Sequence, residues 1–328
     1  MQYINTEQIF SISNSKGFEQ IALEVFRYQA KNSEVYGQFI RNLSIDIQQI
    51  KHLDDIPFLP IEFFKNHQVI TGGSEFSRVF SSSGTTGMSQ SKHYVKDLEL
   101  YIQSYRKAFQ LFYGDINKYA LLALLPSYLE REGSSLIYMV NDLINKSQNE
   151  KSGYFLDDHK LLYQTLKGLK ESHTPVLLIG VTYALLDFIE TYPIEFPELI
   201  VMETGGMKGK RREILREELH EILCAGFGVE SIHSEYGMTE LLSQAYSEGA
   251  GIFHCPPWMK VKIRDTNDPL TLLGVQQSGG LNIIDLANLH SCSFIATQDL
   301  GRSFEDGSFE VLGRFDNSDI RGCNLLVQ

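Results

Sequence analysis

The sequence predicts a mixed α/β fold, because short apolar strands alternate with amphipathic helices through its middle. Three continuous apolar runs have the length of strands buried on both faces of a sheet: 119–125, 176–180 and 199–203. Apolar residues at helical spacing fill the intervals: 161–169, 183–192 and 211–224. The alternation indicates a mainly parallel sheet covered by helices.

The two ends of the chain have sequence patterns that differ from the strand–helix alternation of the middle. Apolar residues between Phe18 and Phe26 recur at helical spacing, and a similar pattern continues over 42–50. Two prolines make 56–60 extended, because a residue before proline disfavours the helical conformation. From about Lys260 the runs shorten and turn residues become frequent, as at 265–269, 278–280 and 305–307, which predicts a smaller β-rich portion.

Composition narrows the functional classes. The 328 residues are 43% hydrophobic, so wholesale disorder is excluded, and the net charge of −12 disfavours nucleic-acid partners and anionic membranes. No apolar run reaches the roughly 18 to 20 residues that span a bilayer, and the start of the chain lacks a secretion signal. The four cysteines are too scattered for a disulfide framework, so we expect a cytoplasmic protein.

The first chemical motif is the run SSSGTTGMSQSK at 81–92. Its glycines Gly84 and Gly87 allow tight turns in which successive N–H groups converge on an anion, and Lys92 supplies a charge. The hydroxyls of Ser82, Ser83, Thr85 and Thr86 add donors. The motif predicts a phosphate-binding loop, and a Ser/Gly-rich surface linker is the alternative.

The second motif is HSEYGMTE at 233–240. An aromatic residue beside a glycine, here Tyr236 and Gly237, can lie flat against a base. The Thr239 hydroxyl and Glu240 carboxylate can contact a phosphate and hold Mg²⁺. The alternative is a strand end at which Thr239 or Glu240 opens the next helix.

The third motif combines Asp299, within QDLGR, with Arg314, within GRFDNSDIRG. An aspartate can bridge two ribose hydroxyls, and an arginine can reach the same sugar or a phosphate. Two charged hairpin turns on a solvated face are the alternative.

These three motifs, in this order, resemble those of the adenylate-forming superfamily of acyl-activating ligases over about residues 57–323. The loop SSGTTGMSQSK and the run LPSYLER at 125–131 look most like the acyl-protein synthetases of bacterial luminescence systems, with phenylacetate–coenzyme A ligases next. The resemblance implies the large N-terminal domain of an adenylate-forming enzyme. It divides the chain into a helical segment (1–56), an α/β nucleotide- and acyl-binding core (57–259) and a β-rich subdomain ending at the hinge motif (260–328).

The resemblance implies that ATP and Mg²⁺ activate an apolar fatty or aryl carboxylic acid as an acyl-adenylate. The acyl group then passes to a thiol on a protein cysteine, a carrier pantetheine, coenzyme A or a partner reductase. In this reading Thr239, Glu240 and Lys92 are catalytic, with Glu240 holding Mg²⁺. The nucleotide is bound by Ser82, Ser83, Gly84, Thr85, Thr86, Gly87, Glu235, Tyr236, Gly237, Asp299 and Arg314. The acyl substrate lies against Tyr128, Arg131, Gly205 and Gly206.

Two departures from the family pattern keep other functions open. Ser89 and Gln90 stand where the family has Pro-Lys, and the chain ends just past the hinge, so we expect the C-terminal lid domain with its catalytic lysine to be missing. The alternatives are an acyltransferase that uses pre-activated acyl groups, and a catalytically reduced nucleotide- or acyl-binding protein within a complex.

Histidines and cysteines give two weaker hypotheses. Zinc prefers histidine and cysteine ligands, which could be supplied by His254, Cys255, His290 and Cys292. The alternative, which is more common for such cysteines, is a thiol packed in the protein interior. Cys323 lies near the C-terminus, where the luminescence synthetases carry an acylated cysteine, and a packed thiol is the alternative.

Overall fold

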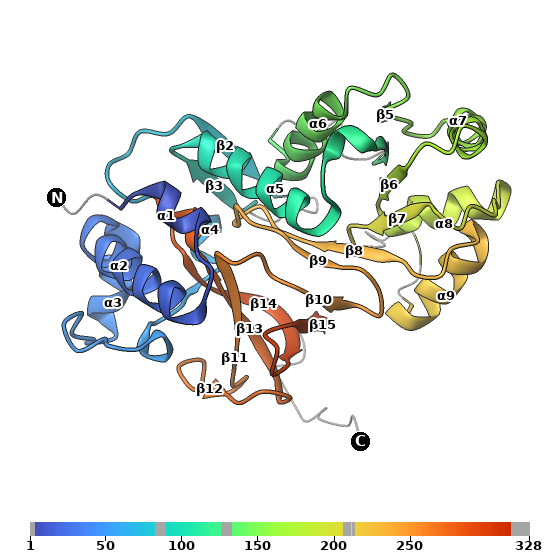
Figure 1. The fold of residues 1–328 in the computed structure, drawn as a ribbon. Coiled ribbons are helices and arrows are strands. Elements are labelled where there is room, and N and C mark those ends of the chain that lie inside the picture. Colours follow the sequence, from blue (N-terminus) through green and yellow to red (C-terminus); the bar gives the residue numbers. More distant parts are fainter. Residues whose placement is uncertain (1–3, 83–89, 126–132, 206–210, 212–213, 316–328) are drawn as a thin grey trace. The chain divides into compact units, whose positions relative to one another are not determined.

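The structure, a computed structural model, describes residues 4–82, 90–125, 133–205, 211 and 214–315 (Figure 1). The chain forms two compact units. The first unit combines Met1–Ser74 with Pro257–Gln328, and the second unit is Glu75–Pro256. Each is described by itself.

The second unit contains the α/β alternation that the sequence predicts. Its elements are β2 (Arg78–Ser81), β3 (Lys92–Val95), α5 (Leu98–Tyr113), β4 (Ala120–Leu124), α6 (Ser135–Ser147), β5 (Gly153–Tyr154), α7 (His159–Glu171), β6 (Val176–Gly180), α8 (Thr182–Thr191), β7 (Ile200–Glu203), α9 (Arg216–Phe227), β8 (His233–Tyr236), β9 (Ala245–Ser247) and β10 (Ile252–Phe253). Six strands form one sheet in the order β5-β4-β6-β7-β8-β9. All neighbours in it are parallel except β8 and β9.

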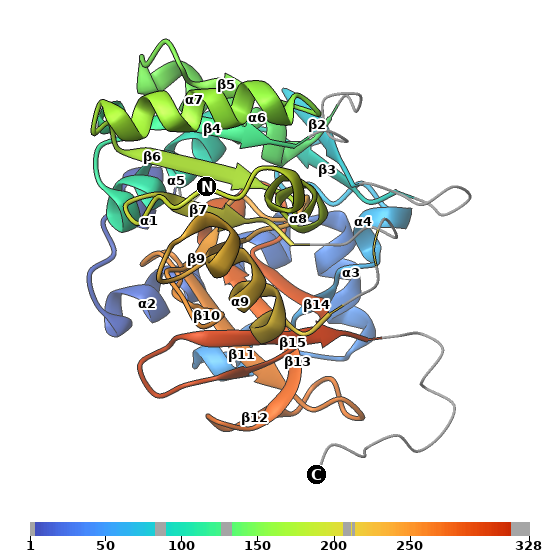
Figure 2. The same cartoon turned by 90° about the vertical axis from the view of Figure 1, so that its right-hand side faces the viewer.

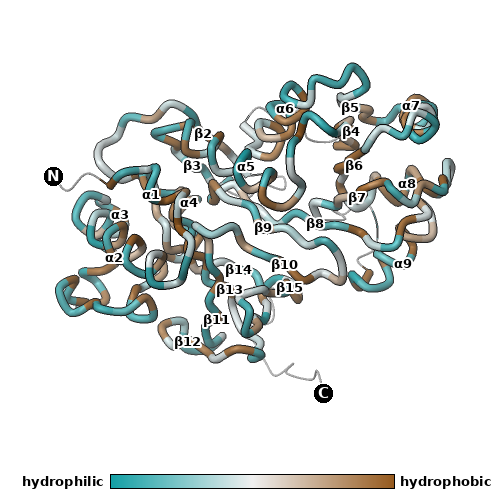
Figure 3. Tube along the Cα trace, in the orientation of Figure 1, coloured by the Kyte–Doolittle hydropathy of each residue, from teal (hydrophilic) through white to brown (hydrophobic). Residues whose placement is uncertain are grey.

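The three apolar runs become the centre of this sheet. All residues of β4 and β6 are buried, as is most of β7, and their hydrophobic character is visible along the chain trace (Figure 3). Strands covered on both faces lose contact with water on both sides, so continuous apolar sequence stabilises them. The prediction of a mixed α/β fold with a parallel sheet is confirmed.

The first unit is built on an antiparallel sheet. Its elements are α1 (Thr6–Phe10), α2 (Ser15–Asn32), α3 (Glu34–Asn42), β1 (Leu59–Pro60), α4 (Phe63–Asn66), β11 (Met259–Arg264), β12 (Leu272–Leu273), β13 (Ser278–Asp285), β14 (Phe294–Ser303) and β15 (Phe309–Arg314). The strands pair in the order β15-β14-β13-β11-β12 (Figure 2). The short strand β1 adds to β14 in parallel, which confirms the extended conformation expected of the proline-containing segment.

A buried glutamine ties the N-terminal helices to this sheet. Gln29 on α2 donates from Nε2 to the Asn288 and Leu289 carbonyls and accepts at Oε1 from the Ser293 N–H. Each polar atom of the amide therefore has a partner, so its burial carries little desolvation penalty. This network is one of the links that hold the first and last parts of the chain in one unit, together with the pairing of β1 with β14.

Three local predictions need correction. The helical pattern over 42–50 does not form a helix, because α3 ends at Asn42 and Ser44 has a left-handed φ of 57°. The helix expected from 211 begins at Arg216. Residues 278–280 are the start of β13 rather than a turn. Gly280 is needed there because a Cβ would lie 2.5 to 2.8 Å from the Arg264 guanidinium. In the described parts of the chain, no helix combines the length and hydrophobicity needed to cross a membrane.

Candidate functional site

Polar residues gather at the carboxyl edge of the parallel sheet in the second unit. Strands β6, β7 and β8 end at Gly180, Glu203 and Tyr236, so the residues that follow them lie at the same edge. Ligands of open α/β sheets bind at this edge, where loops and helix N-termini are free to face them. The motif at 233–240 therefore lies where an α/β sheet binds its ligand.

The Ser/Thr/Gly motif belongs to a hairpin formed by β2 and β3. The Ser82 N–H donates to the Ser91 carbonyl at 3.0 Å, and the Ser91 N–H donates to Ser82 Oγ at 2.9 Å. These two bonds close the base of the loop. Ser83, Gly84, Thr85, Thr86 and Gly87 lie outside the described residues. Lys92, the first residue of β3, is exposed.

His93 joins this hairpin to the Thr-Glu motif. Its side chain is fully buried, and Nδ1 lies 2.9 Å from the Thr239 carbonyl oxygen, 146 residues away in sequence. Burial lowers the pKa of the imidazole to about 4, although the Thr239 contact raises it, so His93 is neutral at physiological pH. Sequence reasoning missed this residue, because a histidine on a short strand carries no signal of such a distant partner.

A third segment meets the same hairpin. The Ser81 N–H donates to the Gly133 carbonyl at 2.8 Å, and a Cβ on Gly133 would lie 2.8 Å from Ser81 Oγ. Gly133 lies two residues after Arg131, the last residue of the run LPSYLER. Tyr128 and Arg131 themselves lie outside the described residues. Gly133, two residues after Arg131 in sequence, is therefore next to the base of the predicted phosphate loop.

Tyr236 and Glu240 are both largely buried at this edge. Tyr236 is 8% exposed, and its ring packs edge-on against Phe253, with 5.8 Å between the ring centroids. Glu240 is 5% exposed, and Gly237 between them is exposed. No helix follows at Thr239 or Glu240, where the chain forms a turn, so the alternative of a helix opening there is wrong.

Glu203 is a buried carboxylate that the sequence analysis left unassigned. Its Oε2 accepts from the Gly205 N–H at 2.6 Å and from Thr182 Oγ1 at 3.3 Å, and its Oε1 lies 3.9 Å from His220 Nε2. Burial raises its pKa, but the neighbouring donors and Arg216 outweigh burial, so the pKa is lowered. Glu203 thus holds Gly205 in place, while Gly206 lies outside the described residues. The sequence signal that could have identified Glu203 is a charged residue at the end of a continuous apolar strand.

Glu235 behaves in the opposite way. Burial first, and then the charge of Glu203, raises the pKa of its carboxyl to about 8. The side chain is partly exposed and lies against Gly237, where an added Cβ would collide with Oε1. At neutral pH Glu235 is therefore mostly a protonated acid, and it adds little negative charge to an edge predicted to bind phosphates.

The third motif lies in the first unit. Asp299 and Arg314 are directly opposite each other on β14 and β15, and Arg314 Nε lies 3.1 Å from Asp299 Oδ1. The Asp299 side chain is 10% exposed, whereas the Arg314 side chain is 72% exposed. Buried Arg264 lies on the same sheet and donates to the Leu281 and Thr297 carbonyls. The paired Asp and Arg therefore form one polar group on adjacent strands.

The described residues give no support to a zinc site. Among them no group of three or more histidine, cysteine or acidic side chains is close enough to hold a metal ion. Cys292 is fully buried and its thiol donates to the Phe294 carbonyl at 3.4 Å. Burial raises the pKa of this thiol to about 12, so it is a packed, unreactive group. Cys323 lies outside the described residues.

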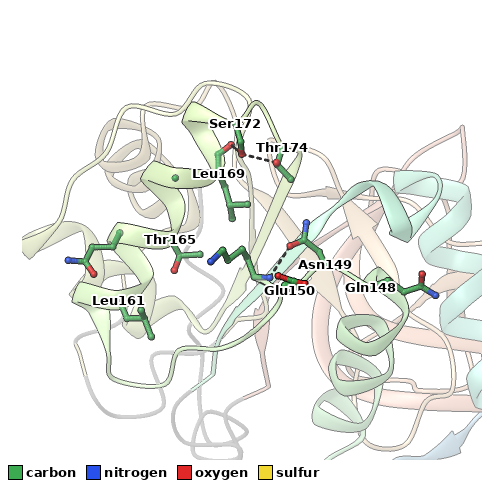
Figure 4. A pocket seen from close by; sticks show the side chains of 11 residues that line it. Gln148, Asn149, Glu150, Leu161, Thr165, Leu169, Ser172 and Thr174 are labelled. Atoms are coloured by element: carbon green, nitrogen blue, oxygen red, sulfur yellow. Dashed lines mark hydrogen bonds between the residues drawn. The ribbon is translucent and has the colours of Figure 1, made fainter.

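A pocket of about 740 Å³ lies at the opposite edge of the sheet, between the α6–β5 connection and α7 (Figure 4). Its lining includes Asn149, Thr165 and Ser172, close to where β5 and β6 begin. No described residue of the predicted site contributes to it. This pocket at the amino edge of the sheet is therefore separate from the described residues of the predicted site.

Solved structures of coenzyme A ligases share this fold. An open conformation of 2-hydroxyisobutyryl-CoA ligase in complex with 2-HIB-AMP and CoA matches with a TM-score of 0.67 and 11% identity, over 92% of this chain and 70% of that chain. ATP-bound MatB from Rhodopseudomonas palustris matches with a TM-score of 0.55 and 15% identity, over 72% of this chain and 47% of that chain. The chain thus spans about half the length of MatB. These likenesses confirm the fold of the large N-terminal domain of an adenylate-forming enzyme.

No protein with a curated functional description matches the sequence. A family model described as "Acyl-protein synthetase, LuxE" matches residues 8–328.

Proposed function

The chain belongs to the LuxE acyl-protein synthetase family, and from this premise we propose that it uses ATP to activate an apolar fatty or aryl carboxylic acid and passes the acyl group to a thiol. One observation carries the proposal: the hydrogen bond from His93 to Thr239 joins the base of the Ser/Thr/Gly hairpin to the Thr-Glu motif. Both motifs carry phosphate-binding groups, and they meet at the sheet edge where α/β proteins bind ligands.

In the proposed adenylation step, a substrate carboxylate oxygen bonds to the α-phosphorus of ATP and pyrophosphate leaves. The loop 82–87 and Lys92 would bind the phosphates, and the Thr239 hydroxyl would donate to an α-phosphate oxygen. Donors fixed in advance stabilise the charge that develops on those oxygens, which is the main source of catalysis in phosphoryl transfer. We propose that Tyr236 stacks on adenine beside Glu235 and Gly237.

Glu240 fits a divalent cation. It is a carboxylate at the carboxyl edge, 5% exposed, directly after the Thr239 hydroxyl, and Mg²⁺ prefers such oxygen ligands. We propose that Glu240 holds Mg²⁺. When bound, the ion would supply positive charge beside the phosphate oxygens.

The ribose is assigned to the first unit. Asp299 presents a buried carboxylate that can accept from two hydroxyls, and Arg314 beside it can donate to the sugar or a phosphate. Their pairing orients the carboxylate before a nucleotide binds. We propose that these two side chains hold the ribose hydroxyls.

The acyl group is assigned to the glycines after β7 and to the segment before Gly133. Val181 and Tyr183, which follow β6 at the same edge, are buried apolar or aromatic residues. Together with Gly205, Gly206, Tyr128 and Arg131 they would favour an apolar acid whose carboxylate meets few other charges. In the transfer step a thiolate sulfur attacks the acyl carbon and AMP leaves.

The test is ATP–pyrophosphate exchange with a panel of fatty, aryl and amino acids, followed by assay for hydroxylamine-labile thioesters on the protein, a carrier protein or coenzyme A. We expect exchange with apolar acids only. Thr239→Ala should lower the exchange rate by about 10² to 10³, and Asp299→Ala should weaken AMP binding in calorimetry. The matched control Ser147→Ala removes a buried hydroxyl at the opposite edge of the sheet and should change neither.

The other outcomes identify the alternatives. Acyl transfer from a pre-activated donor without exchange would indicate an acyltransferase. Nucleotide or acyl binding without either reaction would indicate a binding protein. Exchange with amino acids alone, or an amide product, would contradict the proposed substrate and acceptor.

A further inference from the structure

We propose that His93 is a positioning residue for adenylation: its imidazole fixes the Thr239 main chain relative to the Ser/Thr/Gly hairpin before nucleotide binds. The inference rests on the proposed function, because Thr239 is the proposed contact to the α-phosphate. His93 itself would touch neither ATP nor the acid.

The chemistry of the contact determines the tautomer. A carbonyl oxygen can only accept, so Nδ1, at 2.9 Å from the Thr239 oxygen, must carry the proton. The side chain is fully buried, and burial also lowers its pKa to about 4. His93 is therefore a permanent neutral donor across the pH range of a cell, and it is not a proton-transfer group.

The position of His93 on β3 links its contact with Thr239 to the base of the Ser/Thr/Gly loop. His93 pairs with Phe80 on β2, and it is two residues from Ser91, which closes the base of the loop with Ser82. Its neighbour Lys92 is exposed, because successive side chains of a strand point to opposite faces. One short strand thus presents a cation to solvent and a buried donor to the Thr-Glu motif.

A buried bond of this kind restricts movement of the two motifs. Shifting Thr239 away from the hairpin would leave the Thr239 carbonyl or the His93 donor unsatisfied inside the protein, which is unfavourable. The Thr239 hydroxyl is then held where negative charge develops on the α-phosphate in the transition state, so its contribution is larger there than in the ground-state complex with ATP. Loss of the bond should therefore reduce kcat far more than it raises the KM for ATP.

The kinetic test compares His93→Leu, which removes the donor, with His93→Asn. The asparagine Nδ2 is the same number of bonds from the main chain as the histidine Nδ1. With the apolar acid that best supports exchange, we expect kcat to fall by about 10- to 100-fold in His93→Leu, with a KM for ATP within threefold of wild type. His93→Asn should recover most of the loss.

Ser147→Ala again serves as the control, because it removes a buried hydrogen bond without touching either motif. It should lower thermal stability and leave kcat unchanged. If His93→Leu resembles Ser147→Ala in both respects, His93 is merely structural and the inference is overturned.

A second measurement requires no activity. In ¹⁵N-histidine NMR of the wild-type protein, the His93 ring signals are identified by their absence from the spectrum of His93→Asn, and they should show the Nδ1–H tautomer and no titration between pH 5 and 8. An Nε2–H tautomer, or titration near the ordinary histidine pKa, would overturn the inference. Absence of exchange in the wild-type protein with every acid would instead refute the proposed function, so the two failures are distinguishable.

Discussion

Replacing Glu235 by glutamine should remove a pH dependence of stability that this residue imposes on the wild-type protein. Burial and the Glu203 charge raise the Glu235 pKa from 4.5 to about 8. Between these pH values the carboxyl is ionised in the unfolded chain and protonated in the folded one. The contribution of Glu235 to the stability of the folded protein is therefore fully present below the pKa of Glu235 in the unfolded chain. It is lost as pH rises through the higher pKa of Glu235 in the folded protein.

The size of the effect follows from the same rise in pKa. At about 1.4 kcal/mol per pH unit, a rise from 4.5 to about 8 corresponds to at most about 5 kcal/mol. Because the Glu235 side chain is partly exposed, solvent screens part of this. We therefore expect wild type to lose about 2 kcal/mol relative to Glu235→Gln between pH 5 and pH 9, with little change above it.

Urea unfolding at half-unit steps from pH 5 to pH 9 measures this difference directly. Wild type and Glu235→Gln should diverge as pH rises, whereas the exposed carboxyl variant Glu217→Gln should follow wild type throughout. Parallel stability curves for wild type and Glu235→Gln would show that Glu235 ionises normally in the folded protein, and the reasoning would then be wrong.

Two further changes test the environment of the proposed site. Glu203→Gln should lower stability by about 2 kcal/mol at pH 7, because the charged acceptor of the Gly205 N–H is lost. Because the pKa of Glu203 is lowered from 4.5 in the folded protein, its stabilising contribution is present above 4.5 and is lost as pH falls through the folded pKa, so in acid unfolding wild type and variant should converge as pH falls below 4.5. Gly301→Ala should cost about 1 to 3 kcal/mol in thermal unfolding, since a Cβ there would overlap the Glu310 carbonyl; unchanged stability would mean that β14 and β15 can separate locally.

Three carboxyl groups lie at an edge that is proposed to bind an anionic nucleotide and an anionic acid. Glu203 is surrounded by donors, Glu235 is protonated at neutral pH, and Glu240 is the proposed ligand of Mg²⁺. Repulsion of the substrates is thereby limited without removing the acidic side chains. A variant that lowers the pKa of Glu235, so that its carboxyl is charged at neutral pH, should weaken nucleotide binding because the charge repels the phosphates.

The strands of the second unit could be predicted because their burial leaves a simple pattern in the sequence. Buried parallel strands such as β4 and β6 require continuous apolar residues, and these runs are visible without any knowledge of their neighbours. The pattern fails where a local choice depends on distant atoms. Gly280 predicts a turn by itself, yet it lies within β13, and a glycine is present there because the distant Arg264 side chain occupies the space that a Cβ would need.

The sequence by itself determined the fold class, the family and the residue types of the motifs, because these depend on local order along the chain. Only the tertiary structure decided what those motifs contact. The bond between His93 and Thr239, the contacts of Glu203 with Thr182 and His220, and the pairing of Asp299 with Arg314 each join separate segments. Their energies arise from burial and proximity in three dimensions, and proximity between residues far apart in sequence leaves no periodic signal in a single chain.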